Sequence, residues 1–402
     1  MTRPGAAATI YLPKGFSFSA VAAGIKVSGR LDLALVEASP GTSAAALFTK
    51  NRVVAAPLEV GRASLAKTRG CARAVIVNSG NANCATGKAG LHACREVCRE
   101  AARLLGIRAE EVFPSSTGII GVPLLAEKII AKLPELIAGR QSTERGLAQF
   151  AQAILTTDTR TKVASAHFGS GKTRVNLCGV AKGSGMIHPQ LATMLVYLFT
   201  DLFASPIALK QFLRAACDET FNCISVDGDT STNDTVLLLA SGQSGIQLDS
   251  VKKQFSEALW DVCQSLAVQI VADGEGVQHV IRLSIEQAKD RREALQVARA
   301  IAHSLLVKTA WAGADPNWGR ILAAAGACGV LLDPNHVSIY LGKQRVCRNG
   351  IGCEFDEAEA HQDLAQPNCN IRVQLGRGGA AVLFTTTDLT AEYVRINADY
   401  ST

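Results

Sequence analysis

The spacing of apolar residues changes several times along the chain, between a helical and a strand-like pattern. In GLHACREVCREAARLLGI, residues 90–107, apolar side chains recur at three- and four-residue intervals, which predicts an amphipathic helix. Four more segments repeat that spacing, and shorter apolar or alternating runs predict strands. The expected helices are at 122–137, 142–155, 206–221 and 249–273, and the expected strands are at 74–77, 174–181, 194–200, 235–240, 278–284, 337–341, 370–375 and 380–385.

The order of these elements predicts the fold class. Helices and strands alternate, but not as a strict βαβ repeat, which favours a layered α/β fold with mixed or partly antiparallel sheets. The C-terminal part is richer in strands, and the charged segment EQAKDRREALQVARAIAHSLL, expected as a helix, suggests a domain border within 285–315. A chain of 402 residues is long enough for about two or three domains.

Composition and charge narrow the class of protein. Hydrophobic residues make up 48% of the chain and charged residues 19%, which indicates a globular protein. The net charge of +6 is spread along the chain without a long block of Lys and Arg, so no nucleic-acid partner is expected. No apolar run approaches the roughly 18–20 residues of a membrane span, and the N-terminus lacks the apolar core of a signal peptide. We therefore expect a cytoplasmic protein without a membrane partner.

The chain contains twelve cysteines and no CxxC pair. Cys84, His92, Cys94 and Cys98 lie close in sequence, but their spacing matches no standard zinc pattern. Several cysteines stand in apolar helical or strand-like patterns, which is typical of buried free thiols. We expect no metal site.

The segment AHFGSGKT, residues 166–173, ends in the Gly-Lys-Thr order of a phosphate-binding loop, although Ala166 takes the place of the leading glycine. That mechanism needs a helix directly after the loop. The residues that follow, RVNLCGVA, alternate like a strand, so a hairpin turn is the favoured interpretation. A nucleotide-binding protein is the remote alternative.

The segment SSTGIIG, residues 115–121, is expected as a loop before a helix that begins near Pro123. A loop of this composition can turn backbone N–H groups outward to bind an anion or an oxyanion. It can equally be an ordinary connection whose hydroxyls cap the helix.

Three further polar stretches could line a site. TTDT, residues 156–159, and SVDGDTSTNDT, residues 225–235, gather hydroxyls and carboxylates, and the second lacks the glycine and glutamate of a calcium-binding loop. DGEG, residues 273–276, places Glu275 on a glycine-flanked turn. There the carboxylate could approach a ligand ammonium, or it could simply be solvated.

A single hydroxyl residue, Thr193, opens the apolar run expected as a strand at 194–200. Its hydroxyl could satisfy a local backbone group, or it could be a nucleophile. No GxSxG elbow lies nearby, so one base for a nucleophile is the threonine's own α-amine, which has a pKa near 8. That amine is free only if the bond between Ala192 and Thr193 is cut, and the pliable KGSG approach suits an N→O acyl shift there.

Motifs along the whole chain, taken together, resemble the bifunctional ornithine acetyltransferase / N-acetylglutamate synthase family of arginine biosynthesis. The matching stretches include GVAKGSGMIHPQLATM, VNSGNANCATG, PSSTGIIG, TTDT, VDGDTSTNDT, DGEG, DPNWGRI and the terminal INADYST. The resemblance implies an αββα-like core of the N-terminal-nucleophile type and a smaller, strand-rich C-terminal domain. It also implies that the precursor cuts itself between Ala192 and Thr193.

The resemblance assigns roles to individual residues. Thr193 becomes the nucleophile and the first residue of a β chain (193–402), after an α chain (1–192). Residues 193–285 would complete the core and 286–402 would form the C-terminal domain. The family typically assembles as two α and two β chains, without metal or organic cofactor. Thr117 and Gly118 match the family's oxyanion-hole pair, and its substrate-binding positions match Thr159, Lys182, Thr193, Glu275, Asn397 and Thr402.

The implied reaction moves an acetyl group from N-acetylornithine to glutamate through an acetyl-threonine intermediate. By charge matching, Glu275 is expected to pair with a substrate ammonium and Lys182 with a carboxylate. Val277-Gln278-His279 and Gln190-Leu191 depart from the usual family residues, and the first departure bears on substrate preference. The use of acetyl-CoA as a second donor stays open. A related aminopeptidase or amidase, with water as acceptor, is the alternative within the same chemistry.

Overall fold

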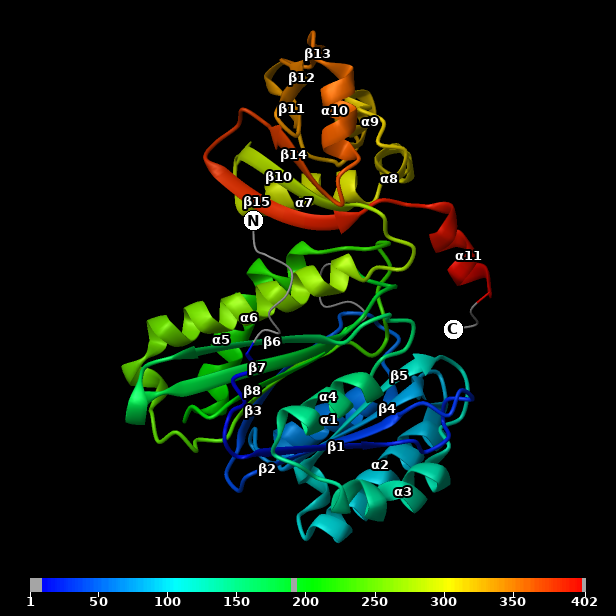
Figure 1. Ribbon diagram of the computed structural model, residues 1–402, viewed down its shortest axis with the longest axis vertical. Coiled ribbons are helices and arrows are strands. Elements are labelled where there is room, and N and C mark those ends of the chain that lie inside the picture. Colours follow the sequence, from blue (N-terminus) through cyan, green and yellow to red (C-terminus); the bar gives the residue numbers. More distant parts are fainter. Residues whose placement is uncertain (1–8, 189–193, 400–402) are drawn as a thin grey trace.

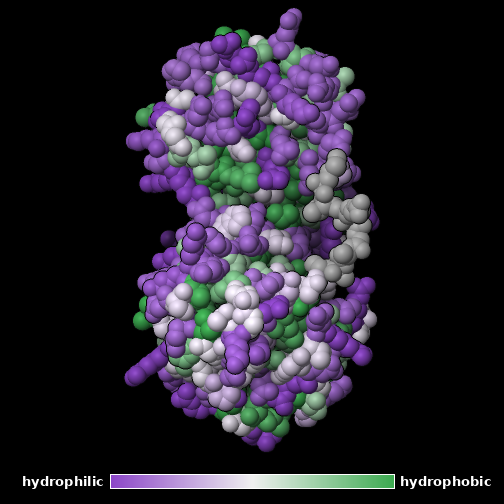
Figure 2. Space-filling view, turned by 60° about the vertical axis from the view of Figure 1, so that its left-hand side comes forward, coloured by the Kyte–Doolittle hydropathy of each residue, from purple (hydrophilic) through white to green (hydrophobic). Residues whose placement is uncertain are grey.

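The computed structural model describes residues 9–188 and 194–399, and within them the chain forms three β-sheets. Two sheets stack face to face in a layered core, and the third belongs to a separate C-terminal unit (Figure 1). Figure 2 shows the molecule narrowing between these two parts, with hydrophilic residues over most of the visible surface of the C-terminal unit. No helix in the described ranges is long and apolar enough to cross a membrane.

The five-stranded sheet forms the centre of the core. Its strand order is β3 (Ser43–Phe48), β9 (Thr235–Ala240), β8 (Leu195–Thr200), β7 (Val175–Lys182) and β6 (Lys162–Phe168). Every residue of β8 and β9 is buried, because helices α5 (Pro206–Glu219) and α6 (Lys252–Ala272) cover one face and the second sheet covers the other. Strand β8 pairs parallel with β9 and antiparallel with β7.

The four-stranded sheet has the order β1 (Phe16–Val21), β2 (Leu33–Ala38), β4 (Ala74–Asn81) and β5 (Val112–Ile119). Side chains alternate along β4: Val75 and Val77 face the five-stranded sheet, while Ala74 and Ile76 face the outer helices. Those helices are α1 (Ala56–Lys67), α2 (Gly87–Leu105) and α3 (Ala126–Ala138), and α4 (Glu144–Ala153) packs on β1 and β2. The layers therefore follow the predicted αββα order.

The C-terminal unit is built on a six-stranded sheet with its own apolar core. Its strand order is β13 (Ile351–Gly352), β12 (Gln344–Arg348), β11 (Ser338–Leu341), β14 (Asn368–Gln374), β10 (Val280–Ala288) and β15 (Ala380–Thr387). The helices of this unit are α7 (Arg291–Ala302), α8 (Leu305–Ala312), α9 (Trp318–Gly326) and α10 (Glu357–Leu364). The expected border at 285 and 286 falls inside β10. The last helix, α11 (Ala391–Asp399), leaves this sheet and runs back towards the core (Figure 1).

The hairpin expected around 166–173 is confirmed. Strands β6 and β7 pair antiparallel from Lys162 with Ala181 to Phe168 with Val175, and a short 3-10 turn at Gly171–Thr173 joins them. No helix follows Thr173, so the phosphate-loop alternative lacks the helix N-terminus that it needs.

Two expectations about individual elements are wrong. Residues 115–119 belong to strand β5 instead of a loop, and the next helix begins at Ala126, later than Pro123. The small residues of this segment fit a buried strand that pairs parallel with β4, so tertiary packing overrides their turn-like composition. The charged segment 286–306 is also not one helix. It starts as the end of β10 and is then divided between α7 and α8, which Asp290 and Ser304 cap.

Candidate active site

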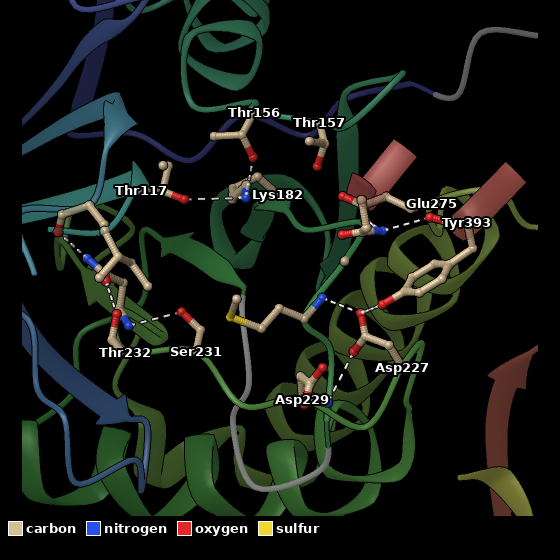
Figure 3. Close-up of a pocket in the computed structure, with 17 residues that line it drawn as sticks. Thr117, Thr156, Thr157, Lys182, Asp227, Asp229, Ser231, Thr232, Glu275 and Tyr393 are labelled. Atoms are coloured by element: carbon tan, nitrogen blue, oxygen red, sulfur yellow. Dashed lines mark hydrogen bonds between the residues drawn. The ribbon is translucent and has the colours of Figure 1, made fainter. Parts of the chain in front are cut away.

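A cavity of about 120 Å³ lies where the ends of several core elements meet helix α11 (Figure 3). Strand β5 and the loop after α4 supply part of its lining, and Lys182 supplies the end of β7. The loop 225–235, the turn at Glu275 and helix α11 complete it. The residues that line it include Thr117, Gly118, Thr156, Thr157, Lys182, Asp227, Glu275, Tyr393 and Asn397.

Thr117 and Gly118 reach the cavity because β5 is irregular at its end. The pairing of β4 with β5 shifts register at Gly80 and Asn81, opposite residues 117–119. Gly118 has φ +133°, and a Cβ there would lie 2.3 Å from the carbonyl carbon of Gly80. Only glycine fits this conformation and this close approach of two strands. The residue pair expected as an oxyanion hole thus lies at the wall of the cavity.

Lys182 is a buried cation in the same wall. Its Nζ donates to Oγ1 of Thr156 at 2.8 Å and to Oγ1 of Thr117 at 3.4 Å, and it lies 3.8 Å from Oδ2 of Asp158. Burial lowers the pKa of Lys182, and the charge of Asp158 opposes that change. The amine therefore faces two hydroxyls of the cavity and has one carboxylate behind it.

Behind Lys182 lies a buried chain of charges. Nζ of Lys162 is 2.6 Å from Oδ1 of Asp158 and 2.6 Å from Oδ2 of Asp273, and all three side chains are almost fully buried. Burial alone would raise the pKa of Asp158, but the ammonium groups of Lys182 and Lys162 outweigh burial and lower it to about 2. Asp158 is therefore ionised at neutral pH and keeps Lys182 in place.

Thr159 does not line the cavity. Its backbone N–H donates to Oδ2 of Asp273 at 3.1 Å, and its hydroxyl donates to Oδ1 of the same carboxylate. The neighbouring Thr156 and Thr157 line the cavity instead. Sequence reasoning missed these two threonines, although the TTDT run that contains them was recognised. Thr159 therefore contacts Asp273, two residues before Glu275 in the chain.

Glu275 projects into the cavity from a tight turn. Its backbone N–H donates to the carbonyl of Ser184 at 2.9 Å, which ties the turn to the end of β7. A Cβ at Gly185 would lie 2.4 Å from Oε2 of Glu275, so a larger residue there would displace the carboxylate from this position. On the other side, Nδ2 of Asn397 donates to Oε2 at 2.9 Å.

Helix α11 brings Asn397 and Tyr393 to the site. The hydroxyl of Thr390 donates to the carbonyl of Gly276 at 2.7 Å, just before the helix begins. A Cβ at Gly276 would lie 2.4 Å from the backbone nitrogen of Tyr393, so the helix rests directly on the glutamate turn. The sequence pattern around 394–399 was polar and did not predict a helix.

The loop 225–235 closes the remaining side. Nδ2 of Asn233 donates to the carbonyls of Ala82 and Ser116 at 2.7 and 2.8 Å, which ties this loop to β4 and β5. Oδ1 of Asp234 accepts from the backbone N–H of Met194 at 2.9 Å, at the start of β8. Ala192 and Thr193, the predicted cleavage site, and Thr402 lie outside the described residues.

Among the described residues, no group of three His, Cys, Asp or Glu side chains is placed to hold a metal ion. Cys94 and Cys98 are buried in the core on α2, whereas His92 on the same helix is exposed. The cavity therefore offers hydroxyls, one ammonium and carboxylates for substrate recognition.

Comparison with known proteins identifies the family. The family model described as "ArgJ family" matches residues 17–402. A protein of Parasynechococcus marenigrum named arginine biosynthesis bifunctional protein ArgJ is 44% identical over 391 residues, which cover 97% of this chain and 94% of the relative. A protein of the same name from Methylococcus capsulatus is 44% identical over 394 residues, covering 96% and 95%.

A solved structure of the protein of that name from Bacillus halodurans is 39% identical, with a TM-score of 0.49, and covers 51% of this chain and 98% of that one. The two sequence matches cover nearly the whole length of this chain and of each relative. The chain belongs to the ArgJ family.

Proposed function

We propose that this enzyme, an ornithine acetyltransferase (glutamate N-acetyltransferase) of the ArgJ family, transfers the acetyl group of N2-acetyl-L-ornithine to L-glutamate. The observation that carries the proposal is the convergence of Thr117, Gly118, Lys182, Glu275 and Asn397 on one cavity. Thr117 and Gly118 come from β5 and the other three from separate segments later in the chain, and each is a residue that the family resemblance singled out.

The nucleophile of the proposed reaction is made by self-cleavage. Oγ of Thr193 attacks the carbonyl carbon of Ala192, the amide becomes an ester, and the α-amine of Thr193 is freed. Water then hydrolyses the ester to the carboxylate of Ala192 and the free hydroxyl of Thr193. The described flanks of this site, at Met186 and Met194, are anchored by carboxylates beside the cavity. That placement supports a nucleophile delivered into the cavity.

Acetyl transfer then runs in two half-reactions. Oγ of Thr193 attacks the acetyl carbonyl while the α-amine takes its proton, and ornithine leaves with a proton on its amine. The amine of glutamate attacks the acetyl ester, and the threonine is regenerated. In both half-reactions the negative oxygen would face the end of β5, where losing one donor typically costs ~2.7–4 kcal/mol of transition-state stabilisation.

The charges of the cavity match the charged groups of the substrates. Glu275 offers an anion for a substrate ammonium, and Lys182 offers a cation for a carboxylate. The α-amine of N-acetylornithine is acetylated and that of glutamate must attack as a free amine, so the charged group that both substrates share is the α-carboxylate, which Lys182 would bind. Glu275 would pair with the side-chain ammonium of ornithine. The cytoplasmic location, the α2β2 assembly and the absence of a cofactor remain predictions, and acetyl-CoA is a candidate second donor.

The deciding experiment follows both the chain and the acetyl group. Denaturing mass spectrometry should give two fragments divided after Ala192 for the wild type and one intact chain for Thr193→Ala. Incubation with N-acetylornithine and glutamate should give N-acetylglutamate with a slower release of acetate. Release of acetate at the same rate with and without glutamate would favour an amidase, and an intact, active wild type would contradict the mechanism.

A further inference from the structure

Asp227 lies where three segments of the site meet (Figure 3). Its Oδ2 accepts from the backbone N–H of Met186 at 2.5 Å and from the hydroxyl of Tyr393 at 3.2 Å. Its Oδ1 accepts from the N–H of Ile187 at 2.9 Å and of Asp229 at 3.2 Å. Each oxygen thus accepts two hydrogen bonds. The donors lie in the segment before the predicted cleavage site, in helix α11 and in the loop that carries Asp227.

The same loop holds the approach in two further ways. The carbonyl of Ile187 accepts from the N–H of Val226 at 2.9 Å and from the hydroxyl of Ser225 at 2.9 Å. Met186 has φ +56°, a conformation that costs a non-glycine residue free energy and needs support from its surroundings. The contacts of Asp227 and Ser225 supply that support.

The two flanks of the predicted cleavage site are therefore anchored by one loop. Asp227 holds Met186 and Ile187 before it, and Asp234 holds Met194 after it. Attack of a hydroxyl on the preceding carbonyl requires the reacting atoms to be held in a near-attack geometry, and a misplacement of ~1 Å can cost ~100-fold in rate.

We propose that Asp227 is the positioning residue for self-cleavage and that its contact with Tyr393 joins the cleavage-site approach to the substrate-binding helix α11. This inference rests on the proposed function, because it needs a cut between Ala192 and Thr193. Asp227 does not itself react: it acts through the backbone of Met186 and Ile187.

The ionisation of Asp227 supports this role. Burial raises its pKa to about 6, against the hydrogen bonds from Asp229, Met186 and Tyr393. The charged groups that face it are Asp229 in its own loop and Lys308 on α8, whose Nζ donates to the carbonyl of Val226 at 2.8 Å. Burial disfavours an ionised carboxylate at this position. The four donors around Asp227 compensate, because only an anion with two accepting oxygens can satisfy all of them.

Asp227→Asn tests the proposal directly. The amide keeps the size of the side chain but turns an NH2 group towards one pair of donors, so we expect about 100-fold slower conversion of precursor to fragments. Asp249→Asn makes the same chemical change at an exposed residue and should be cut at the wild-type rate. Tyr393→Phe removes only the hydrogen bond between helix α11 and Asp227. It should be cut within about twofold of the wild type but should have a raised KM for N-acetylornithine.

The outcomes separate the two proposals. If the wild type is not cut after Ala192, the proposed function fails. If the wild type is cut and folded Asp227→Asn is cut equally fast, only the positioning role is overturned. If Asp227→Asn does not fold, Asp227→Glu replaces it as the test. Glutamate keeps the charge but is longer, so it should slow cleavage if the position of the Met186 and Ile187 backbone matters. Cleavage of Asp227→Glu at the wild-type rate would overturn the inference.

Discussion

Asn397, near the end of the last helix, donates a hydrogen bond of 2.9 Å to Glu275, which lies 122 residues earlier in the chain. The helix that carries Asn397 contributes no buried side chain to either core. Thr390 and Asn397 instead contact the glutamate turn, and Tyr393 contacts Asp227. Helix α11 thus contributes to the site much more than to the stability of the fold.

Asn397→Ala should separate these two contributions. Hydrogen bonds to a charged group contribute about 1.5–3 kcal/mol, so kcat/KM for N-acetylornithine should fall about 10- to 100-fold. The midpoint of thermal unfolding should change little, because the side chain is exposed. Asn335→Ala, at an exposed turn, is the matched control for both measurements. A large fall in unfolding temperature with unchanged kinetics would contradict this view of α11.

Gly118→Ala should disturb the end of β5. The new Cβ would meet the carbonyl carbon of Gly80 at 2.3 Å in addition to the strain of φ +133°. We expect a loss of stability of about 2–3 kcal/mol and a fall in acetyl transfer of at least about 100-fold. Gly121→Ala is the control, since it shares the positive φ, +83°, but meets no atom within 4 Å. If the two variants behave alike in denaturation and kinetics, close packing of β5 on Gly80 is unimportant.

The two buried lysines should respond differently to substitution. Lys162→Met leaves Asp158 and Asp273 without their shared cation, and loss of one partner of a buried ion pair costs about 3–5 kcal/mol. Lys182→Met leaves Asp158 paired with Lys162 and should mainly raise the KM for both substrates. Urea denaturation and steady-state kinetics of both variants test this difference, with the exposed Lys252→Met as control. An unchanged KM in Lys182→Met would contradict its role in binding a carboxylate.

His303 should make the protein less stable in acid. Burial, together with the charges of His188, Lys308 and Arg299, lowers its pKa from 6.5 to about 4. Below the ordinary pKa the unfolded chain binds a proton that the folded protein refuses, so stability present at neutral pH is lost as pH falls from about 6.5 to 4. The contribution is about 2 kcal/mol between about pH 7.5 and about pH 5.

The variant His303→Gln should lose that part of the pH dependence. Glutamine can keep the contact with the hydroxyl of Ser225, which lies 3.0 Å from Nε2 of His303. Urea denaturation at the two pH values measures the difference. His188 lies beside His303, with ring centroids 4.8 Å apart, and its pKa is also lowered, so part of the acid sensitivity should remain. An equal loss of stability in wild type and variant would show that His303 is not responsible.

The apolar pattern predicts the central strands β7, β8 and β9 well because their burial is nearly continuous, but it does not predict β1, β2 and β3 of the same core. Strand β9 has the predicted bounds, and β8 begins one residue later than predicted. The prediction also failed at residues 115–119, where Ser, Thr and Gly form a strand that pairs parallel with β4. A single sequence contains no signal of that neighbour.

The same limit applies to the site residues: a motif can identify them, but it does not show which partner each side chain contacts. The residues in recognisable motifs, such as Lys182 and Glu275, do line the cavity. Within TTDT, however, all three threonines carry the same chemistry, and only the fold turns Thr159 towards Asp273 and Thr156 towards Lys182. The partner of Asp227 on α11 could not be predicted either, since Tyr393 is 166 residues away in sequence.

The antiparallel pairing of β7 with β8 has a consequence for a protein cut between them. The two strands are neighbours in the middle of the five-stranded sheet, paired from Leu177 with Thr200 to Lys182 with Leu195. A break within 189–193 would put them on different polypeptides while leaving every one of these pairs intact. The fragments could separate only by opening the sheet and the cores on both of its faces. Dissociation of the two fragments would then be the same event as unfolding, so the stability of the cut protein would depend on its concentration.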